Sequence, residues 1–229
     1  MNNTGAIAHT LLPVWFAIPS LTNFKSVRMS SCAAPRTDFS GMHPGHGGTY
    51  TSSNELSYYR QYASARFGLT QKKGGWDCTR HYEIIASGCV PYFVGLHLVL
   101  DSLTMYALPK RMLLQALELP GVPSESLFKD PPALQEQLKL RQYLKLDHSK
   151  FNTSAYCNLA ERLIEYSDTA LTAEALGKYV VTNIQASVLG EGTPLRMLIV
   201  TGDEADMQAT LTYQGLYLVL GADSITTWT

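Results

Sequence analysis

The fold is decided by residues 64–93, which read SARFGLTQKKGGWDCTRHYEIIASGCVPYF. Residues 65–70 are an apolar run typical of a short buried strand, and residues 89–94 form a second run of the same kind. A polar loop, residues 71–77, and a helical stretch, residues 78–87, lie between them. This order predicts a compact βαβ unit, in which two adjacent parallel strands are joined by a right-handed crossover.

Two residues mark the ends of the predicted helix. Asp77 has a side chain that can accept hydrogen bonds from the first turn, so we expect it to be the N-cap. Gly88 follows the last apolar position and is expected to take the left-handed conformation that commonly ends a helix.

Three regions follow when the chain is read outward from this segment. Residues 1–48 carry four prolines and a glycine cluster, which predicts an irregular segment with short strands, including a core strand within residues 6–18. Residues 49–189 predict an α/β domain with a Rossmann-like parallel sheet flanked by helices. Residues 190–229 begin with a glycine- and proline-containing linker and continue as an incomplete second βαβ unit that ends where a sheet would normally continue.

The remaining elements are predicted from periodicity and helix caps. Helices are expected from the N-cap Ser53 onward and over residues 110–119, 133–146, 153–166, 172–184 and 206–220, and further strands over residues 196–201 and 224–228.

Composition restricts the partners. The chain has 18 Lys and Arg residues and 19 Asp and Glu residues, so its formal net charge is −1. A chain this close to neutral has no overall electrostatic field that would attract a nucleic acid or an anionic membrane. Residues 6–18 are apolar but are interrupted by Pro13 and are shorter than the roughly 20 residues of a membrane span. No basic residue precedes them, as one would in a signal peptide. We expect a soluble protein, in the cytoplasm rather than the Golgi lumen.

The cysteines are Cys32, Cys78, Cys89 and Cys157, and no two form a CxxC or CxxH pair. This spacing argues against a zinc knuckle and a thioredoxin-like motif. Four scattered cysteines predict buried thiols in a reducing compartment.

The loop at residues 71–77 has the composition of an anion site. In parallel α/β sheets, ligands bind beyond the carboxyl ends of the strands, and a helix N-terminus attracts negative charge. Glycines expose backbone N–H groups there, lysines add charge, and a tryptophan can stack on a base or sugar. The candidates in this loop are Lys72, Lys73, Gly74, Gly75, Trp76 and Asp77. The alternative is an ordinary turn with solvated lysines and a tryptophan that anchors the loop.

Arg80 and Glu83 extend this hypothesis into the helix. They are three residues apart and therefore share a face. A guanidinium suits a diphosphate and a carboxylate suits ribose hydroxyls, although the pair could equally be a local ion pair. His81 could contact a ligand or act as a base, but a packed, hydrogen-bonded histidine is favoured.

A metal site is not expected. His43 and His46 form an HxxH pattern, yet Pro44 and the surrounding glycines exclude the helix that would place both imidazoles on one face. No metal site is therefore predicted at this motif.

Residues 64–93 resemble the nucleotide-sugar-binding half of exostosin-like glycosyltransferases. The shared features are a strand, a polar loop, a helix with Arg80 and Glu83, and the step Gly88-Cys89-Val90-Pro91 into the next strand. The segments KKGGWDC, RHYEI and GCVPYF look like those of an exostosin-related group of proteins from algae and large viruses. The resemblance extends over roughly residues 50–179.

The resemblance implies a GT-B-like transferase with two Rossmann-like halves, which uses a nucleotide sugar without a bound metal. Arg80 would contact the diphosphate and Glu83 the ribose or sugar hydroxyls, and the acceptor would be a carbohydrate or glycoconjugate hydroxyl. Only about 50 residues precede the similar region, so we expect the acceptor-binding half, with its catalytic base, to be missing. The alternatives are a non-catalytic nucleotide-sugar-binding module, a truncated remnant of such an enzyme, and a purely structural α/β domain.

Overall fold

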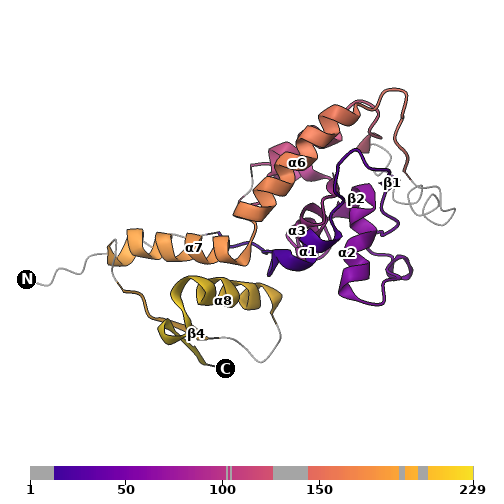
Figure 1. Ribbon diagram of the computed structural model, residues 1–229. Coiled ribbons are helices and arrows are strands. Elements are labelled where there is room, and N and C mark those ends of the chain that lie inside the picture. The colour runs from indigo at the N-terminus through magenta and orange to yellow at the C-terminus, as the bar shows by residue number, and fades with distance from the viewer. Residues whose placement is uncertain are drawn as a thin grey trace, which may run out of the picture.

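A computed structural model of the chain describes residues 13–101, 103, 105–125, 144–190, 194–200 and 206–228. One part of it is built on a parallel sheet of β1 (Thr37–Phe39), β2 (Ala65–Gln71) and β3 (Val90–Val94), in the order β1-β2-β3. Figure 1 labels β1 and β2 of this sheet. The fold is therefore mixed α/β, with a three-stranded parallel sheet flanked by helices. β1 lies inside the region predicted to be irregular, and it is an edge strand of this sheet.

The predicted βαβ unit is confirmed. β2 and β3 pair in parallel with Leu69 opposite Tyr92, and helix α3 (Thr79–Ala86) connects them. Gly88 has the predicted left-handed backbone, with φ of +79°. The prediction that Asp77 caps α3 is wrong, because Cys78 is the N-cap residue. The Asp77 carboxylate instead accepts hydrogen bonds from the Phe16 backbone and the Tyr82 hydroxyl.

Helix α2 (Glu55–Ala63) begins one residue later than predicted. Its N-cap is Asn54, whose side chain accepts from the Ser57 N–H, while the Ser57 hydroxyl accepts from the Asn54 N–H. This reciprocal capping box satisfies two backbone donors and explains why the helix starts there rather than after Ser53.

The other elements surround the sheet or follow it. They are the helices α1 (Leu21–Val27), α4 (Lys110–Leu117), α6 (Thr153–Ala170), α7 (Ala173–Ile184) and α8 (Met207–Leu220), the short helical turns Gly47–Thr49, Leu96–Val99, Gln185–Leu189 and Ala222–Ser224, and the strands β4 (Met197–Val200) and β5 (Ile225–Trp228). α1 was not predicted, α4 ends two residues earlier than expected, and α6 continues four residues further.

Two sequence predictions concern the edges of the described chain. Of the predicted helix over residues 133–146, residues 133–143 lie outside the described part, and residues 144–146 are not helical. The core strand predicted within residues 6–18 is wrong for residues 13–17. Ile18 alone forms an isolated parallel bridge, because its N–H and C=O are bonded to Leu171 and Ala173 at the α6–α7 junction.

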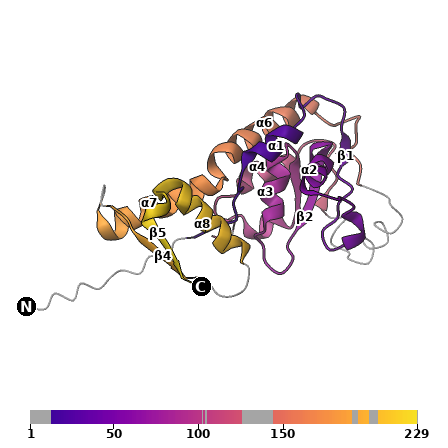
Figure 2. The same ribbon diagram turned by 60° about the horizontal axis from the view of Figure 1, so that its bottom comes forward.

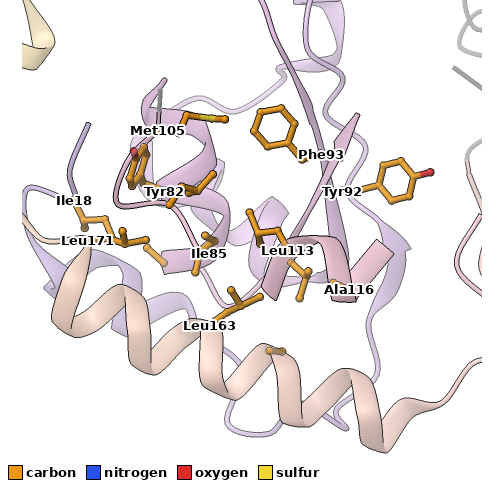
Figure 3. Packing of buried hydrophobic residues seen from close by; sticks show 14 of the residues in the cluster. Ile18, Tyr82, Ile85, Tyr92, Phe93, Met105, Leu113, Ala116, Leu163 and Leu171 are labelled. Atoms are coloured by element: carbon orange, nitrogen blue, oxygen red, sulfur yellow. The ribbon is translucent and has the colours of Figure 1, made fainter. Parts of the chain in front are cut away.

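The main core lies between the sheet and the helices. Gly68 in β2 allows α3 to approach closely, since a Cβ there would lie 3.0 Å from Ile84. On the other face of β2, Phe67 packs against Tyr156 of α6 at 5.3 Å between ring centres. Leu163 in the same helix lies near Ile85, and both belong to one buried cluster (Figure 3).

The C-terminal residues form the second βαβ unit. β4 and β5 pair in parallel and α8 connects them. α8 lies beside α7 (Figure 2), and the two backbones meet at Gly177 and Gly215. The predicted boundary at residues 190–194 remains a prediction, since residues 191–193 lie outside the described part.

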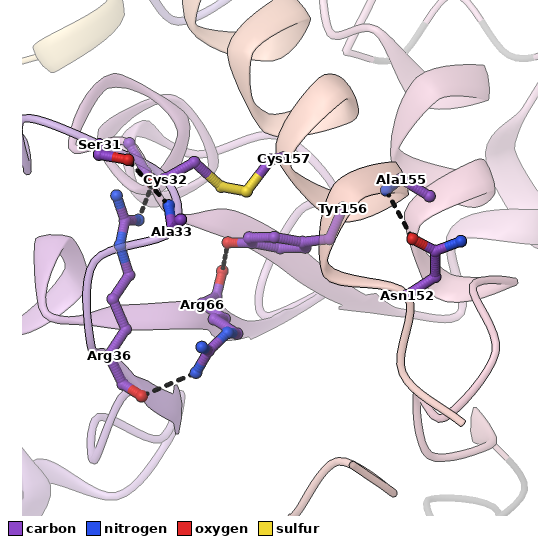
Figure 4. The surroundings of a disulfide bond; sticks show 10 residues. Ser31, Cys32, Ala33, Arg36, Arg66, Asn152, Ala155, Tyr156 and Cys157 are labelled. Atoms are coloured by element: carbon purple, nitrogen blue, oxygen red, sulfur yellow. Dashed lines mark hydrogen bonds between the residues drawn. A yellow bond between two sulfur atoms is a disulfide. The ribbon is translucent and has the colours of Figure 1, made fainter. Parts of the chain in front are cut away.

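A disulfide joins Cys32 to Cys157, with the Cα atoms 5.5 Å apart (Figure 4). The prediction of four free thiols is therefore wrong for these two cysteines. They are 125 residues apart, and only the folded chain brings the segment after α1 against the first turn of α6. Cys78 and Cys89 are free, as predicted.

None of the helices in the described ranges combines the length and the apolar composition that crossing a membrane requires.

Candidate functional site

The candidate site is the connection from β2 to α3, at the carboxyl end of a central parallel strand. Lys72, Lys73, Gly74 and Gly75 are exposed there. Neither glycine has a positive φ, and a Cβ built at Gly74 would have no neighbour within 4 Å. These glycines are thus not required by the backbone conformation, and they leave the peptide groups that follow the two lysines exposed.

Trp76 anchors this loop to the body of the protein. Its ring lies 6.3 Å from that of Phe93, and a Cβ built at Gly95 would touch it at 3.6 Å. The Lys72 ammonium lies over the same ring, 5.4 Å from its centre, in a cation–π contact. This geometry supports the alternative that Trp76 anchors the loop to the protein. The same ring also holds Lys72 in place.

The N-terminus of α3 lacks a polar cap. Cys78 occupies the N-cap and makes no capping hydrogen bond, whereas a polar side chain caps each of α2, α6, α7 and α8. Burial raises the pKa of the Cys78 thiol, and the Arg80 charge and the N–H groups of the first turn oppose that rise. The His81 N–H already donates to the Cys78 carbonyl at 3.2 Å, and a neutral thiol is a weak acceptor, so it is the Thr79 and Arg80 N–H groups that keep most of their capacity to bind an anion.

Arg80 is positioned at the end of β2. Its Nε donates to the Thr70 hydroxyl at 3.1 Å and its Nη2 to the Gln71 carbonyl at 3.3 Å. The residue is only 9% exposed. Among the described residues, Nη1 has no hydrogen-bond partner, so one arm of a fixed guanidinium remains available beside the loop.

Glu83 lies in different surroundings. The Tyr58 hydroxyl donates to its Oε2 at 2.9 Å, and no direct ion pair joins it to Arg80, although both residues are described. Burial raises the pKa of Glu83, and the Tyr58 hydrogen bond and the Arg80 charge partly oppose this shift. Arg80 and Glu83 are therefore held by separate hydrogen bonds and not by an ion pair with each other.

Glu83 lines a small cavity of about 170 Å³ between α1, α2, α3 and α8. Glu55 and Tyr59 contribute to its wall, and Tyr59 donates to Glu55 at 2.6 Å. Thr79, the first residue of α3, also lines it. The cavity therefore begins at the first residue of α3, and no described residue of the loop at 71–77 lines it.

His81 is a packed, hydrogen-bonded histidine, which is the alternative that the sequence favoured over a ligand contact or a base. It is fully buried, stacks on Phe93 at 4.5 Å, and burial lowers its pKa to about 3, so it is neutral. Its Nε2 lies 2.8 Å from the Trp76 carbonyl, which can only accept, so Nε2 carries the proton. Nδ1 must then accept from the Thr70 hydroxyl at 2.9 Å.

Thr70 is the residue that the sequence reasoning missed. Its hydroxyl donates to His81 and accepts from Arg80, and so fixes both side chains. The sequence signal that could have identified Thr70 is a hydroxyl residue at the last position of the predicted strand, directly before the polar loop.

Asp77 is buried next to α3 in a role other than the predicted cap. Burial raises its pKa to about 6, against the hydrogen bonds from Tyr82 and the Phe16 backbone. Its Oδ1 is buried and forms no hydrogen bond. A carboxyl group with a pKa near neutrality is suited to proton transfer, and this property is common in active sites.

The HxxH motif has no metal-binding partners among the described residues, where no group of three or more His, Cys, Asp or Glu side chains is arranged to hold an ion. His43 is buried, and its backbone N–H donates to the Thr49 hydroxyl.

Comparison of the chain with protein-family models, with curated proteins and with solved structures finds no match in any of the three.

Proposed function

We propose that the chain binds a nucleoside diphosphate sugar at the β2–α3 connection. The observation that carries this proposal is the uncapped N-terminus of α3 beside the fixed guanidinium of Arg80. Backbone N–H groups at a helix start and a planar cation are the two groups that proteins most often direct at a diphosphate. The exposed Lys72 and Lys73 add charge at the same place.

The sugar or ribose has a site next to the diphosphate in this proposal. Thr79 in the first turn of α3 lines the 170 Å³ cavity, and the carboxylates of the lining, Glu55 and Glu83, can accept from vicinal hydroxyl groups. The resemblance to exostosin-like glycosyltransferases assigns the same role to Glu83. It adds the reaction, which is transfer of the sugar to an acceptor hydroxyl by half of a GT-B-like architecture, and it requires no metal.

Calorimetry with UDP, GDP and their sugar conjugates, in the presence of EDTA, tests donor binding. We expect one of these ligands to bind. In Arg80→Lys its affinity should fall about tenfold to a hundredfold, because a charge-assisted hydrogen bond of about 1.5–3 kcal/mol loses its geometry. Arg60→Lys, the same exchange at an exposed position of α2, is the matched control and should bind normally.

Two results would count against donor binding: no heat with any nucleotide in a folded sample, or equal affinity in Arg80→Lys and Arg60→Lys. Transfer is tested separately, by release of free nucleotide from the bound donor in the presence of a glycan acceptor. Binding without release would favour the alternative of a non-catalytic nucleotide-sugar-binding module.

A further inference from the structure

A second cavity, of about 590 Å³, lies against β1, the edge strand of the sheet. Residues 36–41 line one side, and residues of the segment 144–148 line the other. The side chains that matter here are Arg36, Asp38, Ser40, Arg66, Lys145 and His148. The lining runs along β1 from Arg36, which precedes the strand, to Gly41, which lies two residues after its end, so the cavity follows the edge of the sheet. The β2–α3 connection instead follows the carboxyl end of the central strand.

The cavity carries excess positive charge. Arg36, Arg66 and Lys145 are cations, and Asp38 is the only acidic residue among the described residues of the lining. The Asp38 carboxylate is already engaged, since it lies 3.1 Å from His148 Nε2, 3.8 Å from Arg66 Nη1 and 3.1 Å from the Leu146 N–H. An anion that entered the cavity would thus meet at least two cations, Arg36 and Lys145, that form no ion pair with a carboxylate of the described residues.

Unpartnered polar atoms gather at the same place. Eight buried side-chain N or O atoms of the described residues form no hydrogen bond, and three of them are Arg36 Nε, Ser40 Oγ and Arg66 Nε. The residue Ser40 is 2% exposed. Buried polar groups are almost always paired, and leaving one unpaired costs about 1–3 kcal/mol. All three atoms lie beneath the surface of the cavity, so the donors that a ligand would meet are the outer nitrogens of the arginines and the exposed Lys145 ammonium.

The two guanidinium groups are held in position by the protein. Arg36 Nη1 donates to the Gly88 carbonyl at 2.7 Å, and Arg66 Nη1 donates to the Arg36 carbonyl at 2.8 Å (Figure 4). The Cys32–Cys157 disulfide and Tyr156, which donates to the Arg66 carbonyl, lie next to them. Preorganised cations of this kind bind an anion with little loss of conformational entropy.

We propose that this cavity binds the phosphate monoester of a small organic molecule, such as a sugar phosphate. A phosphate dianion matches two uncompensated cations, and its three terminal oxygens can accept from guanidinium and ammonium donors. The volume is in the range of about 300–1,000 Å³ that is usual for small-molecule sites, and it leaves room for an organic group. The proposal does not depend on nucleotide binding at the β2–α3 connection.

Calorimetry with glucose 6-phosphate and ribose 5-phosphate on the full chain tests the proposal, with glucose and inorganic phosphate as separate arms. We expect a sugar phosphate to bind, glucose not to bind, and inorganic phosphate to bind more weakly. Binding should persist at saturating UDP and in Arg80→Lys, which separates this site from the proposed donor site.

Two variants locate the site. Arg36→Gln and Lys145→Glu should each weaken sugar-phosphate binding about fivefold or more, through a lost cation and a reversed charge. Lys150→Glu, an exchange at an exposed lysine outside the cavity, should leave it unchanged. The proposal is overturned if neither sugar phosphate binds, if inorganic phosphate binds as tightly as both, or if all three variants bind like the unmodified chain.

Discussion

Single hydroxyl and carboxyl groups decide how the β2–α3 connection is built. The Thr70 hydroxyl links Arg80 to the neutral ring of His81, and that ring in turn holds the Trp76 carbonyl. The sequence singled out Arg80 and the loop as candidates for an anion site, because their residue types and spacing are typical of such sites. It could not identify this network, because a hydrogen bond between a strand and a helix depends on their relative placement.

Asp77 is expected to destabilise the protein at neutral pH. Its pKa of about 6 exceeds the value of about 3.8 in an unfolded chain, so between these values the native state binds more protons. The free energy of unfolding therefore falls as the pH rises from about 3.8 through 6, because the native state must give up a proton that it binds more tightly than the unfolded chain does. Asp77→Asn keeps a neutral side chain and should raise the free energy of unfolding by roughly 1–3 kcal/mol at pH 8.

Urea unfolding of both proteins from pH 4.5 to pH 8 measures this effect. The gain in Asp77→Asn should shrink as the pH falls through 6, and Asp101→Asn, at an exposed position, should show no gain at any pH. A gain that is constant with pH would show that ionisation of Asp77 is not its cause.

At the scale of whole elements, prediction succeeded where contiguous residues carry the signal. β2, α3 and β3 follow from two apolar runs, a polar loop and a terminal glycine within 30 residues. α1 was missed because it has seven residues and follows a proline, and the edge strand β1 has only three. The cavity against β1 could not be predicted either, since Asp38 and His148 are 110 residues apart in the chain.

The contact between α7 and α8 depends on two glycines. A Cβ on Gly215 would overlap the Ala173 carbonyl, and a Cβ on Gly177 would overlap the Gly215 backbone. Because backbone atoms cannot move aside as a side chain can, Gly215→Ala should separate the helices and lower the free energy of unfolding by about 2 kcal/mol or more.

The matched control is Gly47→Ala, at a position with no neighbouring atom and no positive φ. Chemical denaturation of the two variants checks the prediction. Equal stability would mean that α7 and α8 do not pack in the way described.

At the scale of the whole molecule, the Cys32–Cys157 disulfide is the one covalent cross-link among the described residues. A cross-link over 125 residues restricts the unfolded chain strongly, and native disulfides typically contribute about 2–4 kcal/mol. The double variant Cys32→Ser/Cys157→Ser should lose stability of that order, because its unfolded state regains freedom.

Urea unfolding with and without a reductant checks this. Reductant should destabilise the unmodified protein and leave the double variant unchanged. Thiol labelling of the denatured, unreduced protein should find two free thiols, Cys78 and Cys89, and four would contradict the cross-link.

The disulfide also turns the chain into a ring with two tails. All three strands of the main sheet lie inside the ring, while most of α6 and everything after it belong to one tail. A protease that cuts the ring once therefore releases nothing: the product migrates as one species on a non-reducing gel and as two after reduction. A cut in the tail after α6 yields separate fragments on both gels, so paired gels of a limited digest assign each cleavage to the ring or to a tail.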